Sequence, residues 1–433
     1  MLSRATFGEP TDVGGREAAE MVTGAAPGRQ SQQAMRVLFL TPELPHPADS
    51  GGTIKAASIL DYLRRRHEVH VLCFRRRPLT DEQSRWSTVV GQVETVPLNR
   101  GRNPLNLLRS YIWGLPLSIE RNRSGLMTEL VLERLRSGEY DVVFVDGWLM
   151  AQYLPRDFAG LAVLHQHNAE HVMWRRQAER EANRLLRMLT RLEYRRVRRY
   201  EAAILPRFRT VFAVSEADRQ ALVELGARPE RLRLLPNLPP PALLERPALS
   251  FGSAEAVILY FGTLSWQPNI EGVEHFLRFV FPLVRRRAPE ARFVIAGRGA
   301  PARLQRLARR TAGVDVLGSV EDAEPLFRRA RVFVEASRSG GGTRLKVLNA
   351  LARGLPVVAS PEGAGGLEVV SGQHLLVADD PPSMAEAVAR LLHDEAMWRL
   401  LSENGRALIR RRYLAEAAYR PLDEVVSGVG ARA

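Results

Sequence analysis

Short, predominantly apolar runs alternate along this chain with longer amphipathic stretches. In the first half, the apolar runs lie at 35–41, 68–74, 140–146, 161–165 and 210–214. In the second half, they lie at 256–261, 291–296, 314–317, 332–335, 356–359 and 374–377. Runs of Val, Ile, Leu and Phe separated by helical stretches are typical of βαβ units, in which a parallel sheet is covered on both faces. The pattern therefore predicts an α/β fold.

A proline-rich segment separates the two halves of this pattern. Residues 236–241 read PNLPPP, and this composition predicts a linker. We therefore expect an N-terminal domain at 35–238 and a C-terminal domain at 239–415. Both are predicted to be Rossmann-like doubly wound domains that face each other across a cleft, because open α/β sheets bind ligands at the carboxyl ends of their strands.

The two ends of the chain differ from these domains. Residues 1–34 are rich in Gly, Ala, Gln and charge and show no periodicity, so we predict a disordered extension or a start codon placed before Met35. Residues 416–433 are expected to form a C-terminal helix that packs back on the N-terminal domain. No run reaches the roughly 18 apolar residues that a membrane-spanning helix needs, and the sequence has no signal peptide, so we expect a cytoplasmic protein.

Composition narrows the chemistry of the partners. The chain has one cysteine, Cys73, which lies in a predicted strand and is expected to be a core residue rather than a reactive thiol. The formal net charge is +14, and most of the excess comes from arginine. A basic balance of this size favours phosphorylated small molecules, anionic membrane surfaces or nucleic acid as partners.

The arginines are concentrated in one segment. Residues 174–209 contain twelve Arg and four Glu, and Leu185, Met188, Leu189 and Leu192 follow the spacing of one helical face. This segment fits a surface helix with a solvated basic face, or a helix that lies on anionic lipid and serves a lipid-linked acceptor, peripheral on the inner face of the membrane. We expect no nucleic-acid partner, because no aromatic interleaving or nucleic-acid-binding motif accompanies the arginines.

A glycine-rich turn is the most informative stretch of the sequence. Residues 337–360 read SRSGGGTRLKVLNALARGLPVVAS, so three glycines lead into a helix that should end at Gly354. The N-terminus of a helix is an anion site, because its N–H groups carry partial positive charge. Arg344 and Lys346 add cations there, which costs about 0.3–1 kcal/mol each unless an anion is present. A bound diphosphate would supply that anion.

Histidine and acidic side chains gather at predicted strand ends. His165, His167 and His171 have a spacing that resembles short metal-binding motifs, but no fourth ligand is nearby, so we expect no metal site. One cleft histidine with two structural neighbours is the preferred interpretation. Asp146 and Glu335 are possible general bases, although a structural or helix-capping role is favoured for each.

Several segments together resemble one enzyme family. In the second half, these are YFGTLSWQPNIEGVEHFL, FVIAGRG, VDVLGSVEDAEPLFRRARVFVEASRSGGGTRLKVLNALARGLPVVASPEGAGGL and HLLVADDP. In the first half, they are VLFLTPELPHPADSGGTIKAASIL, HQHNAEHVMW, VFAVSEADR and RLLPN. The chain resembles the retaining GT-B glycosyltransferases of the family-4 type (glycosyl transferases group 1). The resemblance implies a GT-B architecture and transfer of a sugar from a nucleoside diphosphate sugar to an acceptor hydroxyl with retention. The sequence has no Asp-x-Asp pair of the kind that metal-dependent sugar transferases use, so we expect no metal and no cofactor.

The resemblance also implies a set of site residues and partners. Catalytic roles fall to His167, Arg344 and Lys346. The donor nucleotide sugar would be bound by Gly51, Gly52, Gly262, Thr263, Arg298, Val320, Gly340, Gly341, Gly342, Thr343 and Asn349. The acceptor would be a small molecule or a lipid-linked sugar, and the process would be polysaccharide or glycoconjugate biosynthesis.

The chain departs from the family at two acidic positions. Members usually carry two glutamates around the glycine turn, where this sequence has Gly341 and Asn349. Asn349 can still bond a ribose hydroxyl, but a neutral hydrogen bond is worth about 1 kcal/mol against roughly 1.5–3 kcal/mol for a charged one. Two alternatives therefore stay open: a catalytically impaired relative that binds nucleotide or lipid, and a sugar-nucleotide epimerase on the same architecture.

Overall fold

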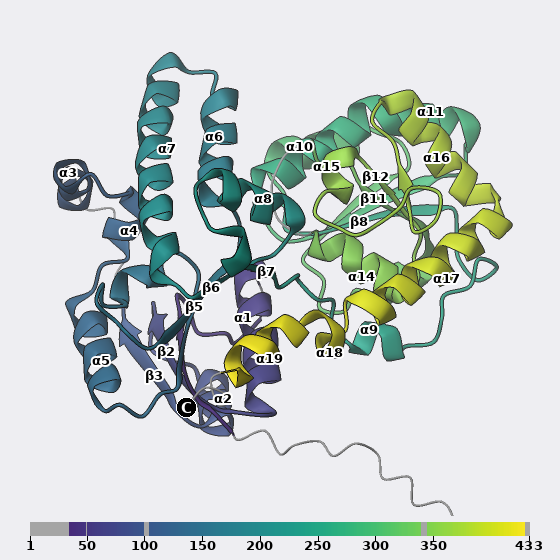
Figure 1. Ribbon diagram of the computed structural model, residues 1–433. Coiled ribbons are helices and arrows are strands. Elements are labelled where there is room, and N and C mark those ends of the chain that lie inside the picture. Colours follow the sequence, from purple (N-terminus) through teal and green to yellow (C-terminus); the bar gives the residue numbers. More distant parts are fainter. Residues whose placement is uncertain (1–33, 49, 99–103, 339–343, 429–433) are drawn as a thin grey trace, which may run out of the picture. The chain divides into compact units, whose positions relative to one another are not determined.

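The computed structural model describes residues 34–48, 50–98, 104–338 and 344–428. The predicted extension at 1–34 therefore lies outside the described residues except for its last position. Ala34–Ala433 forms one compact unit, and the ribbon in Figure 1 shows that it contains two sheets, each with its own helices.

The first sheet has seven strands in the order β3-β2-β1-β4-β5-β6-β7. Neighbouring strands run parallel throughout. The strands are β1 Arg36–Thr41, β2 Glu68–Arg75, β3 Val93–Pro97, β4 Val142–Asp146, β5 Leu161–Gln166, β6 Thr210–Ala213 and β7 Leu232–Leu234. The reversal of strand order between β1 and β4 is that of a doubly wound Rossmann-like sheet.

The second sheet has six strands in the order β10-β9-β8-β11-β12-β13, again all parallel. The strands are β8 Val257–Phe261, β9 Arg292–Ala296, β10 Val314–Gly318, β11 Ala330–Glu335, β12 Val357–Ala359 and β13 Leu376–Val377. Here the strand order reverses between β8 and β11. The predicted α/β fold with two Rossmann-like domains is thereby confirmed.

Helices connect the strands and cover the sheets (Figure 1). Those before the second sheet are α1 Gly51–Arg64, α2 Asp81–Val90, α3 Pro104–Trp113, α4 Leu117–Arg121, α5 Gly125–Arg136, α6 Glu170–Arg180, α7 Arg184–Ile204, α8 Glu216–Glu224 and α9 Ala242–Glu245. Those that follow are α10 Gln267–His275, α11 Phe281–Arg287, α12 Ala302–Arg309, α13 Glu324–Arg329, α14 Leu345–Arg353, α15 Pro361–Ala364, α16 Pro381–His393, α17 Glu395–Arg412, α18 Ala415–Ala418 and α19 Arg420–Ser427. Short 3₁₀ turns lie at Met150–Tyr153, Leu205–Arg207 and Pro229–Arg231, and a π-helical turn at Phe276–Val280 joins α10 to α11.

The central strands are buried on both faces. All five residues of β4 are buried, as are all but the first residue of β1. The rings of Phe39 and Phe144 stack across these two strands with centroids 5.1 Å apart. Alternate residues of these strands pack in two different clusters, with Val37 and Phe39 in one and Leu38 and Leu40 in the other. A slip of one residue would move every side chain to the opposite face and so into the wrong cluster. The register in turn fixes which residues end side by side at the carboxyl edge.

The C-terminal segment returns to the first sheet's helices. Tyr419 is fully buried, and its hydroxyl lies 3.1 Å from Lys55 Nζ and 2.9 Å from Ser58 Oγ of α1. Tyr62 of α1 donates a hydrogen bond to Asp423 of α19. Lys55 also donates to the backbone oxygens of Leu235 and Pro236. Burial lowers the pKa of Lys55 well below its usual range.

The structure differs from the sequence predictions in three elements. Strands β3 and β7 were not predicted, and both lie at the edges of the first sheet. The basic segment 174–209 is not one helix, because α6 ends at Arg180 and Asn183 caps a new helix, α7, by accepting hydrogen bonds from the amides of Leu185 and Leu186. Helices α6 and α7 pack side by side as a hairpin (Figure 1). Within the described residues, no helix is both long and apolar enough to cross a membrane.

Candidate active site

Topology brings polar side chains to the carboxyl edge of each sheet. The strand order reverses between β1 and β4 in the first sheet and between β8 and β11 in the second. Ligands of open α/β sheets bind at such reversals, because the connections on either side diverge and leave a crevice. Thr41 and Asp146 end the two strands of the first reversal, and Phe261 and Glu335 end those of the second.

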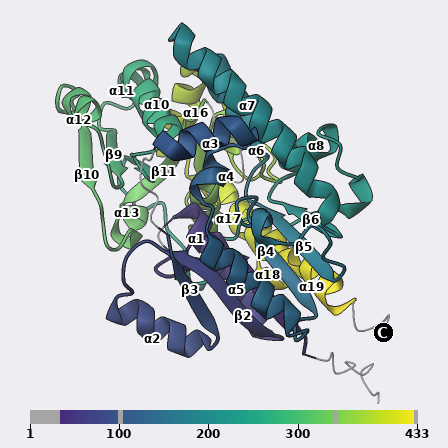
Figure 2. The same ribbon diagram turned by 90° about the vertical axis from the view of Figure 1, so that its left-hand side faces the viewer.

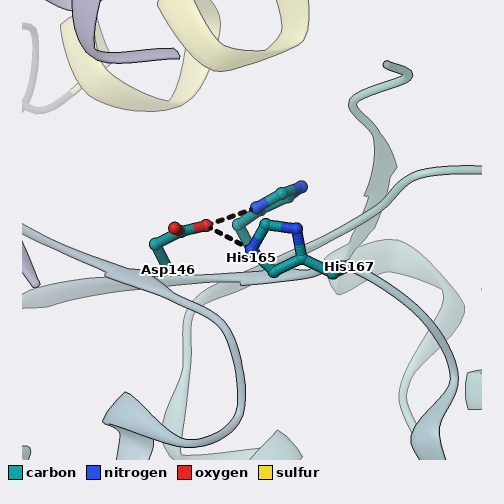
Figure 3. Close-up of side chains that lie close together, drawn as sticks. All are labelled: Asp146, His165 and His167. Carbon is teal, nitrogen blue, oxygen red and sulfur yellow. Dashed lines mark hydrogen bonds and ion pairs between the residues drawn. The ribbon is translucent and has the colours of Figure 1, made fainter. Parts of the chain in front are cut away.

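Asp146 is the centre of a hydrogen-bonded cluster in the first sheet. Its Oδ1 lies 2.8 Å from His165 Nδ1 and 2.9 Å from His167 Nε2. Figure 3 shows both rings directed at this carboxylate. Its Oδ2 accepts a hydrogen bond of 2.9 Å from the Thr41 hydroxyl. Asp146 and His165 are directly paired in the register of β4 and β5, which explains their proximity. One carboxylate therefore orients two imidazole rings.

The protonation of this cluster follows from burial and charge. Burial lowers the pKa of His165 to about 3, so the ring is neutral and its Nδ1 carries the proton that it donates. Burial alone would raise the pKa of Asp146, but the interactions with His167 and His165 lower it well below its usual range. An ionised Asp146 accepts from both rings, so His167 donates through Nε2 and turns its Nδ1 away from the carboxylate. The side chain of His167 is 24% exposed, whereas His165 is fully buried.

Gly147 turns the chain directly after β4. Its φ is +87°, a conformation that L side chains rarely adopt, whereas an added Cβ would make only an ordinary contact of 3.5 Å with His167 Cδ2. The Gly147 amide donates to the backbone oxygen of His165 at 2.8 Å. The turn after β4 therefore holds the loop after β5 close to the sheet.

The same three side chains could also offer ligands to a metal ion. Among the described residues, Asp146, His165 and His167 form such a group, with one potential ligand atom each and all three atoms within 4.8 Å of one another. Hydrogen bonding already accounts for each of these contacts, because the proton donors and acceptors match. His165 Nδ1 would have to lose its proton to bind a metal, and it is fully buried. These observations fit a hydrogen-bonded cluster better than a metal site.

His171 belongs to a separate buried cluster. Its Nδ1 lies 2.6 Å from Glu201 Oε2, and its backbone amide donates to the same oxygen at 3.0 Å. The other oxygen of Glu201 accepts from the Glu170 amide and from Gln166 Nε2. Glu201 of α7 thus anchors the start of α6, and His171 has a structural position.

Helix α1 begins at the edge where β1 ends. Ser50 caps it in a reciprocal pair with Thr53. Gly51 and Gly52 are exposed, and a Cβ added to either would meet no atom within 4 Å. The backbone of this first turn is thus open to approach by a ligand.

Gly262 and Gly297 allow the loops that follow β8 and β9 to pack closely against each other. Gly297 has a φ of +153°, and an added Cβ would lie 1.7 Å from the backbone oxygen of Gly262. The Gly262 amide donates to Ala296 at 3.0 Å, and the Leu264 amide donates to the backbone oxygen of Arg298 at 2.8 Å. No other residue type fits at Gly297 without moving the loop that carries Gly262 and Thr263.

Lys346 is held in a largely buried polar cluster in the first turn of α14. Its Nζ lies 2.7 Å from Glu335 Oε2, 2.7 Å from Asn269 Oδ1 and 3.0 Å from the Tyr260 hydroxyl. An ammonium group has three protons, so these partners occupy all of its donors. Burial lowers the pKa of Lys346, while Glu335 opposes that shift. Contact of Lys346 with a diphosphate stays a prediction, and it requires that at least one of these bonds be exchanged.

Arg344 lies at the N-terminus of α14. Its Nε and Nη2 are both 3.3 Å from the backbone oxygen of Glu362. It lines a cavity of about 140 Å³ together with Met173 and Arg176 of α6 and Asp218 of α8. The cavity is therefore bordered by helices of both sheets. Gly340, Gly341, Gly342 and Thr343 lie outside the described residues.

The remaining predicted residues lie around the second sheet's carboxyl edge. Thr263 accepts a hydrogen bond of 2.7 Å from Asn269 Nδ2 through its backbone oxygen. Val320 is half-buried and follows the end of β10 by two residues. Asn349 lies on α14, and its Oδ1 is buried with no hydrogen-bond partner among the described residues. An unpaired buried acceptor of this kind suits a hydroxyl donor.

Sequence reasoning did not assign Thr41, Asn269 or Tyr260 to the site. Their side chains contact Asp146 or Lys346, but they lie far from these residues in the sequence. Strand register could have indicated Thr41, because β1 and β4 pair at the strand-order reversal. Nothing in the sequence pattern distinguishes Asn269 from an ordinary residue of the first turn of a helix.

Comparison with known proteins matches both halves of the chain to one class of enzyme. The family model described as "Glycosyl transferases group 1" matches residues 255–394, and that described as "Glycosyl transferase 4-like domain" matches residues 50–238. An uncharacterized 44.6 kDa protein in the cps region of Klebsiella pneumoniae is 22% identical over 163 residues, which are 36% of this chain and 42% of that protein. The chain thus matches less than half the length of this curated relative.

Solved structures show the same fold over nearly the whole chain. Sucrose-phosphate synthase from Thermosynechococcus elongatus aligns with a TM-score of 0.66 at 18% identity, covering 92% of this chain and 100% of that one. HepE of Anabaena, in complex with UDP and glucose, aligns with a TM-score of 0.64 at 17% identity, covering 91% and 100%. TarM aligns with a TM-score of 0.67 at 10% identity, covering 92% and 99%. The two matched domains and the shared GT-B fold place this chain in the glycosyl transferases group 1 family.

Proposed function

We propose that this protein transfers a sugar from a nucleoside diphosphate sugar to an acceptor hydroxyl with retention of the anomeric configuration. One observation carries the proposal: a half-exposed imidazole, His167, is oriented by a buried carboxylate at the strand-order reversal of the first sheet. The HepE structure, which shares the fold, contains UDP and glucose and supports a nucleotide-sugar donor.

In the proposed reaction, the bond between the anomeric carbon and the diphosphate oxygen breaks while the acceptor oxygen bonds to the same face of that carbon. The acceptor proton passes to the departing diphosphate. His167 orients the donor sugar through Nδ1, since Nε2 is held by Asp146. Catalysis then depends on positioning and on stabilising the negative charge that grows on the diphosphate.

The proposed diphosphate site is the N-terminal turn of α14. Arg344 is its first cation, and the helix N–H groups add partial positive charge. Lys346 contributes after exchanging a hydrogen bond to Tyr260 or Asn269 for a phosphate oxygen, while its pair with Glu335 persists. Asn349 Oδ1 accepts a hydrogen bond from a ribose hydroxyl, which removes its unpaired state.

We propose that these cations act without a metal ion. A divalent metal would neutralise the same negative charge that Arg344, Lys346 and the helix N-terminus neutralise here. Turnover should therefore continue in excess EDTA. Turnover that EDTA abolishes and Mg²⁺ restores would refute this part of the proposal while leaving the transferase assignment intact.

The departures from the family pattern favour one second candidate function. Asn349 stands where members of the family have a glutamate, so the protein could bind a nucleotide sugar without turning it over. A transferase and a binding protein differ in whether nucleoside diphosphate is released. A transferase releases nucleoside diphosphate in proportion to acceptor, whereas a binding protein releases none over hours.

The proposal extends to acceptor and location. We propose a small-molecule or lipid-linked sugar acceptor bound by the first domain, in polysaccharide or glycoconjugate biosynthesis. The cps-region name of the Klebsiella relative supports a surface-polysaccharide process. The net charge of +14 supports a cytoplasmic protein that is peripheral on the inner face of a membrane.

A thermal-shift screen of nucleoside diphosphate sugars tests the donor. A ligand at 100 times its Kd should stabilise the fold by about 2.7 kcal/mol. The hit is then incubated with candidate acceptors, and release of nucleoside diphosphate is followed. We expect stabilisation and release. Stabilisation without release under any acceptor would favour the binding protein, and stabilisation by no nucleotide would refute both functions.

A further inference from the structure

Large apolar side chains are exposed on two neighbouring helices of the first domain. On α3 they are Leu105, Leu107, Leu108, Tyr111, Ile112 and Trp113, with exposed fractions of 42–70%. On the first half of α7 they are Leu185, Leu186, Met188, Leu189 and Leu192, with exposed fractions of 38–62%. We refer to these eleven residues as the apolar face. Exposed apolar side chains gathered on neighbouring helices mark an interaction site, whereas single exposed residues do not.

Contacts of α3 and α4 with the middle of α7 hold the two helices next to each other. Arg196 of α7 lies over the ring of Tyr111, with Cζ 3.8 Å from the centroid, and its Nη1 is 3.2 Å from Ser110 Oγ. Glu193 of α7 accepts a hydrogen bond of 2.6 Å from the Leu117 amide at the start of α4. Figures 1 and 2 both show α3 beside α7. The buried Glu193–Arg196 pair, 3.1 Å apart, fixes this docking.

The charged side chains that accompany the apolar face on α3 and α7 are all positive. Residues 104–113 and 184–192 contain arginines but no aspartate or glutamate. Arg109, Arg184 and Arg191 are exposed among the apolar residues. A surface that combines exposed apolar side chains with arginine complements an anionic bilayer, whose headgroups attract the arginines while the interface accepts the apolar groups.

We propose that the apolar face docks on an anionic lipid bilayer, with α3 lying in the headgroup region. Tyr111 and Trp113 suit that position, because their amphipathic rings favour the membrane–water interface. A second copy of this chain is a poorer occupant, since pairing two such faces would bring arginines of the same sign together. The basic segment 174–209 thus lies next to a second helix with exposed apolar residues, α3, which the sequence pattern did not indicate.

The docking does not depend on turnover. It would hold the first domain, which carries His167 and the proposed acceptor site, at the membrane surface, where a lipid-linked acceptor would be present. This consequence rests on the proposed function, but bilayer binding itself can be measured without any sugar donor. Failure to bind a bilayer therefore does not imply failure of the proposed sugar transfer, and failure of the transfer does not imply failure to bind.

The test is co-sedimentation of the full chain with vesicles. One set contains equal parts of phosphatidylglycerol and phosphatidylcholine, and the other contains phosphatidylcholine alone. The test variant is the double substitution Ile112→Ser and Trp113→Ser, and the control is Val89→Ser with Leu400→Ser, two exposed apolar residues on α2 and α17. Circular dichroism and thermal melting of all three proteins confirm that each is folded.

We expect the wild type and the control to bind the anionic vesicles, and to do so more weakly as salt rises. The test variant should bind roughly tenfold or more weakly, because two side chains no longer enter the interface. The Trp113 fluorescence, taken as the difference between wild type and Trp113→Phe, should shift to the blue on binding. Equal binding by wild type and test variant would overturn the proposal, as would no binding to anionic vesicles. A dimer that the test variant abolishes would assign the face to a second copy and also overturn it.

Discussion

The carboxylate of Asp146 accepts hydrogen bonds from two imidazole rings and one hydroxyl, and each comes from a different strand end or loop. The side chain of His165 is fully buried, whereas that of His167 is partly exposed. In the proposed reaction, Asp146 is therefore a positioning residue. It would act on the donor sugar through the orientation and tautomer of His167.

Asp146→Asn tests this role. Asparagine keeps the shape but offers a neutral acceptor, and a hydrogen bond to a charged group is worth roughly 1.5–3 kcal/mol against about 1 kcal/mol for a neutral one. We expect kcat to fall on the order of tenfold or more, with a smaller change in the donor KM. The control is Thr41→Val, which removes the third hydrogen bond without touching His167 and should leave kcat within a few fold. Wild-type kcat in Asp146→Asn would contradict the role.

His165 gives the fold a defined pH dependence. Its pKa is lowered to about 3 by burial in the folded state, against an ordinary value of 6.5. Between these values the unfolded chain binds the proton and the folded chain does not, so the free energy of unfolding should fall as pH falls from about 6.5 toward 3. Denaturant unfolding at several pH values measures this slope. His165→Gln should show a shallower slope over that range, and an unchanged slope would mean that other groups dominate.

Among the elements, α14 and β11 carry the proposed diphosphate site. Lys346 of α14 and Glu335 of β11 form a largely buried ion pair that joins the two elements. Such a pair is costly to break, because removing one partner leaves a buried charge without compensation. A simple loss of activity on replacing Lys346 would therefore not distinguish diphosphate binding from folding.

A paired substitution separates these effects. Lys346→Met alone should lower the free energy of unfolding by about 3–5 kcal/mol, and Lys346→Met with Glu335→Gln should recover most of that loss. If Lys346 contacts the diphosphate, the double variant should bind the nucleoside diphosphate identified in the screen more weakly by on the order of tenfold or more, measured by calorimetry. Wild-type affinity for that nucleotide in the folded double variant would remove Lys346 from the proposed site.

The sequence pattern predicted the central strands of both sheets and the helix that ends at Gly354, whose φ of +80° in the structure is that of a glycine cap. It missed β7, which has three residues, and β3, where Glu94 and Thr95 interrupt the apolar run. It also could not find the Asp146 cluster, because the pairing of Asp146 with His165 follows from strand register. The sequence spacing places the apolar side chains of α7 on one face of the helix. It does not show whether another element covers that face, because this depends on which elements pack beside α7.

At the scale of the whole molecule, the chain leaves the first domain at the proline linker and returns to it at its C-terminal end. Lys55 connects the two segments. Its Nζ contacts the backbone oxygens of Leu235 and Pro236, where the linker begins, and the hydroxyl of Tyr419 near the C-terminal end. The C-terminal helix is thus fixed to α1 through buried polar contacts as well as through apolar packing of Leu422 and Val426.

Tyr419→Phe tests this attachment. The substitution keeps the ring over Lys55 but removes the hydroxyl that bonds Lys55 and Ser58. The free energy of unfolding should fall by about 1–3 kcal/mol, because a buried donor loses its partner. Chemical denaturation measures the change. A variant as stable as the wild type would show that the ring packing alone holds the C-terminal segment.

Proton NMR of the reaction, run with a nucleoside diphosphate sugar that supports turnover and with its acceptor, distinguishes retention, inversion and binding without transfer. We expect release of nucleoside diphosphate together with a glycoside of the same anomeric configuration as the donor, and loss of both signals in folded His167→Ala. Tight nucleotide binding with no glycoside formed, or a glycoside of inverted configuration, would contradict the proposed retaining transfer.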